Sequence, residues 1–77
     1  MKVKVLGTGC ANCKRTIALI DEVAKSKSLS IELEKVENIQ DIMSYNILST
    51  PGVVVNDQVV HAGGIPTRDK IEHWLSA

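Results

Sequence analysis

The two cysteines of this chain, Cys10 and Cys13, are only three positions apart in a sequence of 77 residues. A disulfide that closes so short a loop removes little entropy from the unfolded chain and adds little stability. The chain must therefore build an ordinary hydrophobic core, which its length permits and its 44% hydrophobic content can supply. We expect residues 1–77 to form a single domain.

The charge balance and the composition exclude several classes of partner. Nine basic residues offset nine acidic ones, so no general attraction to nucleic acid or to an anionic membrane is expected. Tyr45 and Trp74 are the only aromatic residues, too few for a base-stacking platform. Lys2 and Lys4 interrupt the first apolar run, and no segment reaches the ~20 apolar residues of a membrane span. We therefore expect a cytoplasmic protein that binds neither nucleic acid nor membrane.

The hydrophobic periodicity predicts strands that alternate with helices. Apolar residues recur at every second position in some segments and at helical spacing in others. Asn56-Asp57-Gln58 separates two valine-rich runs and is typical of a tight hairpin turn. The predicted elements are strands at 2–6, 29–36, 53–55 and 59–60, and helices at 11–27, between Asn38 and Asn46, and after Thr67.

The order of these elements, β-α-β-α-β-β-α, predicts an α/β fold. The first two strands, joined by a long helix, should be parallel with a right-handed crossover. The last two strands should form an antiparallel hairpin. A four-stranded mixed sheet with helices on both faces satisfies both requirements. Ile39, Ile42 and Met43 form the apolar stripe of the short helix, and Trp74 is expected to anchor the core from the last one.

Residues 9–13, Gly-Cys-Ala-Asn-Cys, stand where the first predicted strand ends and a helix begins. Residues three apart at a helix start lie roughly 5–6 Å from each other, which a disulfide can span. Free N–H groups and the helix dipole at this end stabilise a thiolate and commonly lower the pKa of a cysteine. Lys14 and Arg15 add positive potential, and the glycines before Cys10 leave its sulfur open. Cys10 is therefore predicted to be the nucleophile, and Cys13, which points back toward the protein body, the resolving thiol.

Two metal-binding interpretations of the cysteine pair stand beside this one. A structural zinc ion requires four ligands, and the spacing of His61 and His73 does not match a second ligand pair. A copper-binding module also clamps a soft metal with a glycine-x-x-cysteine loop after its first strand. Such modules run β-α-β-β-α-β and usually carry a methionine in that loop, unlike this chain. We expect neither a metal site nor an organic cofactor.

Three segments together resemble the thioredoxin-like superfamily, and especially its small glutaredoxin-sized members, which are described as redox-active disulfide proteins. These segments are residues 3–14 with the cysteine pair, residues 49–56 (Ser-Thr-Pro-Gly-Val-Val-Val-Asn) and residues 60–64 (Val-His-Ala-Gly-Gly). The resemblance covers essentially the whole chain. It implies a thioredoxin-like fold with sheet order 2-1-3-4. It also implies a thiol-disulfide oxidoreductase that reduces protein disulfides by exchange with a Cys10–Cys13 dithiol.

The resemblance further implies a substrate-binding surface around the cysteines. Pro51 should follow a cis peptide bond beside the pair, so that the Thr50 backbone can bind an extended substrate like an added strand. Glutaredoxins bind glutathione through a Gly-Gly-x-x-Asp motif, of which this chain has the glycines but not the aspartate. The implied substrate-binding residues are Gly9, Ala11, Asn12, Thr50, Pro51, Gly63 and Gly64.

Two positions depart from the family pattern. Ala11-Asn12 is neither the Gly-Pro of typical thioredoxins nor the Pro-Tyr of typical glutaredoxins, and these residues tune the redox potential. Lys4 occupies the place where ordinary thioredoxins carry a buried acid, and we interpret it as a solvated strand residue. The implied partners are disulfide-containing protein substrates, with thioredoxin reductase or a low-molecular-weight thiol as electron donor. Charged sheet edges favour a monomer.

Overall fold

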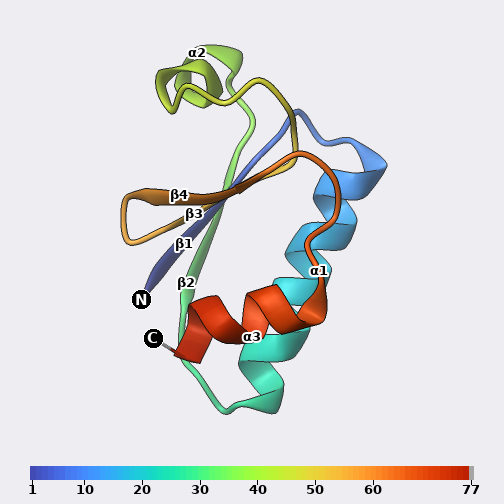
Figure 1. Ribbon diagram of the computed structural model, residues 1–77, viewed down its shortest axis with the longest axis vertical. Coiled ribbons are helices and arrows are strands. Elements are labelled where there is room, and N and C mark those ends of the chain that lie inside the picture. The colour runs from blue at the N-terminus through green and yellow to red at the C-terminus, as the bar shows by residue number, and fades with distance from the viewer. Residues whose placement is uncertain (77) are drawn as a thin grey trace.

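Four strands form one sheet in a computed structural model that describes residues 1–76 (Figure 1). The strand order is β2-β1-β3-β4, so the predicted element order, mixed sheet and strand order are confirmed. The element order also differs from that of the copper-binding modules. Ala77, the last residue of the predicted domain, lies outside the described residues. The elements are β1 (Lys2–Leu6), α1 (Ala11–Ser26), β2 (Glu32–Val36), α2 (Ile39–Ser44), β3 (Gly52–Val55), β4 (Gln58–Ala62) and α3 (Arg68–Ser76).

The central strand β1 sets the register of the sheet. It pairs in parallel with β2, where Leu6 lies opposite Val36, and antiparallel with β3, where Leu6 lies opposite Gly52. The ends of β1 and β2 and the start of β3 therefore share one edge of the sheet. The loop into α1 leaves from that same edge, so residues from three distant parts of the chain meet there (Figure 1).

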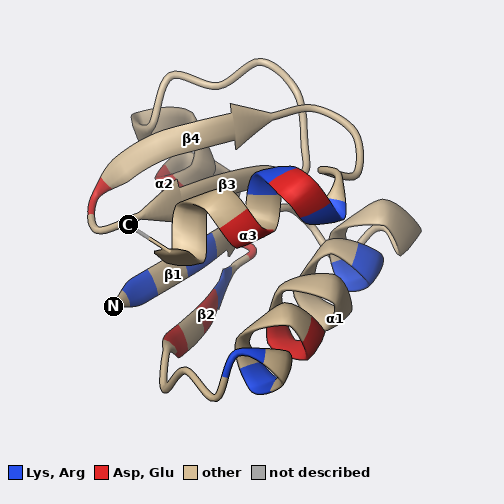
Figure 2. Cartoon of the chain, turned by 60° about the horizontal axis from the view of Figure 1, so that its bottom comes forward, with Lys and Arg blue, Asp and Glu red and all other residues tan. Residues whose placement is uncertain are grey.

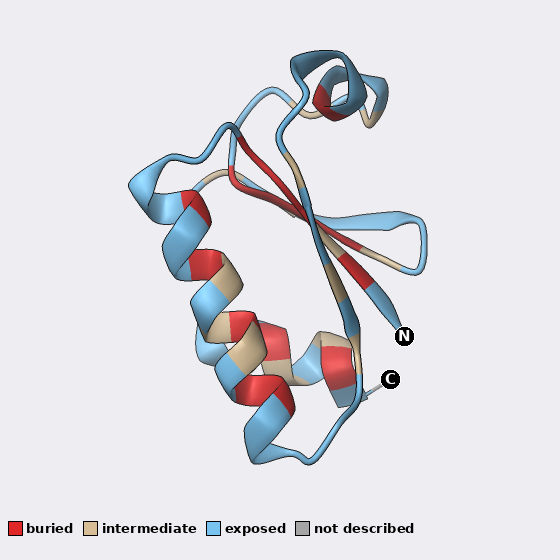
Figure 3. Cartoon of the chain, turned by 180° about the vertical axis from the view of Figure 1, so that it is seen from behind, coloured by how far each residue is buried: buried red, intermediate tan, exposed pale blue. Residues whose placement is uncertain are grey.

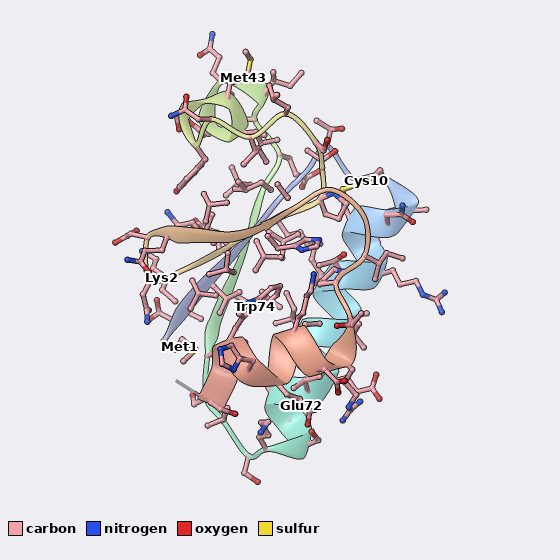
Figure 4. The ribbon with its side chains drawn as sticks, in the orientation of Figure 1. Met1, Lys2, Cys10, Met43, Glu72 and Trp74 are labelled. Atoms are coloured by element: carbon pink, nitrogen blue, oxygen red, sulfur yellow. A yellow bond between two sulfur atoms is a disulfide. The ribbon has the colours of Figure 1, made fainter. Side chains whose placement is uncertain are left out.

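The larger core lies between one face of the sheet and the helices α1 and α3. The buried positions of α1 form a stripe along its inner side (Figure 3). Trp74 packs against this core while remaining partly exposed, and Figure 4 shows it extending from α3 toward the sheet. The buried residues of this cluster are Val3, Val5, Ile20, Val23, Ala24, Val53, Ile71 and Leu75.

The smaller core lies on the opposite face, under α2. It consists of Leu6, Ile42 and Val54. Ile39 and Met43 share the apolar stripe with Ile42, but their side chains are 62% and 66% exposed. The helix has only six residues and lies over one end of the sheet, so Ile42 alone is buried there (Figure 1).

Lys4 points to this second face and is less solvated than expected. Its ammonium Nζ donates a hydrogen bond of 3.2 Å to Tyr45 Oη and lies 3.9 Å from Glu34 Oε2. The hydrogen bond to Tyr45 is the main cause that raises the pKa of Lys4 above its ordinary value. Side chains alternate between the faces of a strand, so the neighbouring Val5 faces the cysteines and Lys4 does not.

Three strands begin at other residues than predicted, and β3 starts one residue early, at Gly52 instead of Val53. The Leu29 N–H donates to the Ala24 carbonyl at 2.8 Å, which continues the end of α1, and β2 starts only at Glu32. In the hairpin, Asn56 and Asp57 both adopt positive φ angles, 49° and 69°. This is a two-residue turn of the kind that favours asparagine and aspartate, so β4 begins one residue earlier than predicted. No helix within residues 1–76 is long and apolar enough to cross a membrane.

Candidate active site

The cysteine pair sits at the amino end of α1. Cys10 is the N-cap residue, with an extended backbone (φ −66°, ψ 162°), and it is joined to Cys13 by a disulfide. The two Cα atoms are 5.0 Å apart, as the spacing predicted. Figure 4 shows the bridge at the start of this helix, next to the loop that leads into β3.

The two sulfurs have different surroundings. Cys10 is exposed, whereas Cys13 is 2% exposed. The backbone N–H of Cys13 donates to Cys10 Sγ at 3.2 Å, so one of the free amide groups of the helix end already points at the outer sulfur. The first turn contains no acidic residue, and the exposed Lys14 and Arg15 follow the pair (Figure 2). Negative charge on the Cys10 sulfur is therefore favoured.

Gly7 lies directly beside the inner sulfur. It is buried, and its N–H donates to the Val36 carbonyl at 2.9 Å, which ties it to the end of β2. A Cβ atom at this position would collide with Cys13 Sγ and lie 3.1 Å from Cys13 Cβ and 3.9 Å from Thr50 Cβ. Only a residue without a side chain fits there. From the sequence, the glycines before Cys10 were expected to leave its sulfur open, but no contact of Gly7 with Cys13 was predicted.

The segment before β3 brings Thr50 and Pro51 to the same place. The Thr50–Pro51 peptide bond is cis, Pro51 is buried and Thr50 is exposed. The Gly63 N–H donates to the Pro51 carbonyl at 2.9 Å, and a Cβ on Gly63 would lie 3.0 Å from Ser49 Cβ. Gly63, with a positive φ of 88°, thus packs closely on this segment.

The remaining candidates fall into two groups. Gly9, Ala11 and Asn12 flank Cys10 and are exposed. Gly64 is exposed too, and no atom lies within 4 Å of its Cβ position. Its neighbour Gly63, and not Gly64 itself, packs on the segment that contains Thr50. Glu37 was not predicted, yet its Oε2 atom lies 3.4 Å from the Cβ position of Gly9. The pairing of Leu6 with Val36 brings it there, and the sequence predicted parallel strands but not this register.

The histidines considered as zinc ligands lie elsewhere. His61 Nε2 is 3.0 Å from the Gly64 carbonyl oxygen, and the His61 ring lies 5.9 Å from that of Trp74. His73 lines a pocket with Trp74 near the hairpin turn. Within residues 1–76, no group of three or more histidine, cysteine, aspartate or glutamate side chains is arranged to hold a metal ion.

The comparisons with known proteins agree with this geometry. A thioredoxin domain family model matches residues 1–76. A thioredoxin of Methanothermobacter thermautotrophicus is 29% identical over 76 residues, covering 99% of both chains. A thioredoxin of Methanocaldococcus jannaschii is 28% identical over 75 residues, covering 97% of this chain and 86% of its own.

A solved structure gives independent support for the fold. Thioredoxin 1 of Thermosipho africanus aligns with a TM-score of 0.59 over 99% of this chain and 96% of its own, at 21% identity. At that identity the match bears on the fold alone, while the family model and the relatives bear on the chemistry. A disulfide at the start of the first helix is what that chemistry requires. The chain thus belongs to the thioredoxin family and is a thiol-disulfide oxidoreductase.

Proposed function

We propose that this protein reduces disulfides of other proteins, with Cys10 as the nucleophile and Cys13 as the resolving thiol. The difference in exposure between the two sulfurs carries the assignment. Cys10 is open to an incoming disulfide, whereas Cys13 is 2% exposed and can be reached from Cys10 but not from a bulky substrate. The Cys10 thiolate attacks a substrate disulfide, and Cys13 then attacks the mixed disulfide and releases the reduced substrate.

We propose that the substrate binds along the segment that contains Thr50. The exposed Thr50 stands beside Gly7 and the cysteine pair, where its backbone can pair with an extended chain. Pro51 and Gly63 support this segment through the bond between them. Gly9, Ala11 and Asn12 are the exposed neighbours of Cys10, and we include the exposed Gly64, next to Gly63, among the substrate-binding residues.

The partners follow from the family. Thioredoxins act on disulfide-containing proteins and receive electrons from a reductase. For this chain we propose thioredoxin reductase or a low-molecular-weight thiol as the donor, with no metal or organic cofactor. We further propose that residues 1–77 act as one domain in the cytoplasm. We also propose that the protein is a monomer, because both outer strands of the sheet carry charged or polar residues.

The Cys13→Ser variant tests the assignment of the two sulfurs. It is expected to accumulate a covalent mixed disulfide between Cys10 and a substrate protein, because the thiol that resolves it is missing. The measurement is a non-reducing gel of the variant mixed with insulin, and added dithiothreitol should release the complex. A Cys13→Ser protein that is folded and forms no such complex would contradict the assignment.

A second measurement separates this function from copper binding. A copper module would purify under reducing conditions with nearly one Cu(I) per chain and would not cycle between dithiol and disulfide. A disulfide reductase would show a reversible two-electron titration of the pair, measured by thiol alkylation in buffers of defined glutathione ratio. Stoichiometric copper without redox cycling would overturn the proposal.

A further inference from the structure

A small pocket opens beside the buried Cys13, and Thr50 is not among its lining residues. Its inner wall is formed by Cys13, Gly7 and the side chains of Val5 and Ile17. Its volume is about 50 Å³, whereas a single water needs roughly 10–15 Å³. The pocket therefore has room for water next to a side chain that is itself 2% exposed.

The rim of this pocket is charged. Lys14 comes from α1, Lys35 from β2 and Glu37 from the residues that follow β2. Glu37 is the only carboxylate among the lining residues, and within residues 1–76 it takes part in no ion pair. A lysine ammonium group donates hydrogen bonds and has no acceptor. Glu37 alone can take up a proton there.

The register of the sheet fixes the position of Glu37. Val36 pairs with Leu6, and its carbonyl accepts the Gly7 N–H at 2.9 Å. The next residue after Val36 therefore runs past the loop between β1 and α1. Its carboxylate oxygen Oε2 lies 3.4 Å from the Cβ position of Gly9, on the edge of the pocket. Backbone pairing thus places residue 37 beside this loop, and the exposed Glu37 side chain reaches the edge of the pocket from there.

The resolving step requires a proton acceptor at this place. A thiol becomes nucleophilic only as the thiolate, and Cys13 is only 2% exposed, so its proton has to leave through the adjoining pocket. We propose that Glu37 accepts the proton of the Cys13 thiol through water held in this pocket. The inference rests on the proposed role of Cys13 as the resolving thiol.

Resolution of the mixed disulfide combines a proton transfer with a thiol–disulfide exchange. In the mixed disulfide, the Cys13 thiol gives its proton to the Glu37 carboxylate by way of the water. The resulting thiolate attacks Cys10 Sγ, the Cys10–Cys13 bond forms, and the bond from Cys10 to the substrate sulfur breaks. The substrate leaves as a thiolate and takes a proton from solvent. Two electrons pass from the dithiol to the substrate, and when the bridge is later reduced, Glu37 returns its proton to Cys13.

The Glu37→Gln variant tests this inference, because it keeps the shape of the side chain and removes the acceptor. The reduced protein is mixed with insulin in the absence of other thiols, quenched with acid at intervals, and the mixed disulfide is measured on a non-reducing gel. At about pH 6.5 we expect resolution to slow about 100-fold, the lower end of the range of general base catalysis. At about pH 9, above the ordinary pKa of a thiol, the difference should disappear.

A matched control is Glu32→Gln, which removes the same charge from β2 at an exposed position that does not line the pocket. It should resolve the mixed disulfide at the wild-type rate at every pH. The rate of mixed-disulfide formation should be the same in all three proteins. Resolution by Glu37→Gln with the wild-type pH profile would overturn the inference, and so would a slowing that is equal at every pH.

Failure of this inference can be told apart from failure of the proposed function. If Cys13→Ser traps the mixed disulfide and Glu37→Gln resolves it normally, Cys13 keeps its role and only the acceptor is wrong. If Cys13→Ser traps nothing, the resolving role itself fails, whatever Glu37→Gln does.

Discussion

Replacing Cys10 with serine is expected to reduce disulfide-reductase activity to the rate of the chemical reductant alone. Cys10 is the only sulfur of the pair that a substrate can reach, since Cys13 is 2% exposed and lies against Gly7. A serine hydroxyl cannot form a disulfide, so no mixed intermediate can arise. The measurement is the reduction of insulin by dithiothreitol, followed as turbidity, at equal concentrations of variant and wild type.

The control for this substitution is Thr8→Ser, a change at an exposed position in the same loop that leaves both sulfurs in place. It should keep the wild-type rate. If Cys10→Ser still accelerated the reaction above dithiothreitol alone, Cys13 would have to be reachable, and the assignment of the two sulfurs would be wrong.

The sequence predicted those parts of the fold that depend on local pattern. The alternation of lysine and valine predicted β1, and the spacing of Ile20 and Val23 predicted α1. Both patterns are informative because side chains repeat every two residues in a strand and every 3.6 residues in a helix. The spacing of the two cysteines predicted the position of the disulfide, because residues three apart at a helix start lie close together. These patterns need no knowledge of the rest of the molecule.

Positions that depend on packing were less predictable. Met43 has the spacing of a core residue but is 66% exposed, because periodicity marks an apolar face and not whether another element covers it. Leu29 alternates correctly with its neighbours, yet its N–H binds the Ala24 carbonyl at the end of α1, and β2 begins later. In the first case tertiary packing decided the outcome, and in the second a local hydrogen bond at the end of the helix did.

The two residues of the site that were not predicted share one cause. Gly7 and Glu37 are thirty positions apart and meet because Leu6 pairs with Val36 in the parallel part of the sheet. The element order predicted that β1 and β2 are parallel but not which residues face each other. A shift of this register by one residue would place different side chains beside Cys13. The sequence therefore predicted the position of the Cys10–Cys13 disulfide but not the residues that surround it.

The Gly7→Ala substitution should reveal how strongly this support is coupled to the disulfide. The new Cβ would collide with Cys13 Sγ and approach Cys13 Cβ to 3.1 Å, in a place where Gly7 is buried. Overpacking of this kind costs about 1–3 kcal/mol of stability. In the oxidised protein the bridge holds the sulfur in place, whereas a free Cys13 thiol can turn to another rotamer. The oxidised form should therefore lose more stability than the reduced form.

Two measurements on Gly7→Ala then have to agree. Urea unfolding of both redox forms should show the larger loss in the oxidised form. The thiol–disulfide equilibrium with glutathione should shift toward the dithiol, by about tenfold for each ~1.4 kcal/mol of difference. Gly64→Ala is the steric control: nothing lies within 4 Å of its Cβ position, and its positive φ of 71° costs the same in both forms. Equal destabilisation of the two forms by Gly7→Ala would mean that the sulfur and the strand end are not coupled, because only a contact with the bridged sulfur distinguishes the redox states.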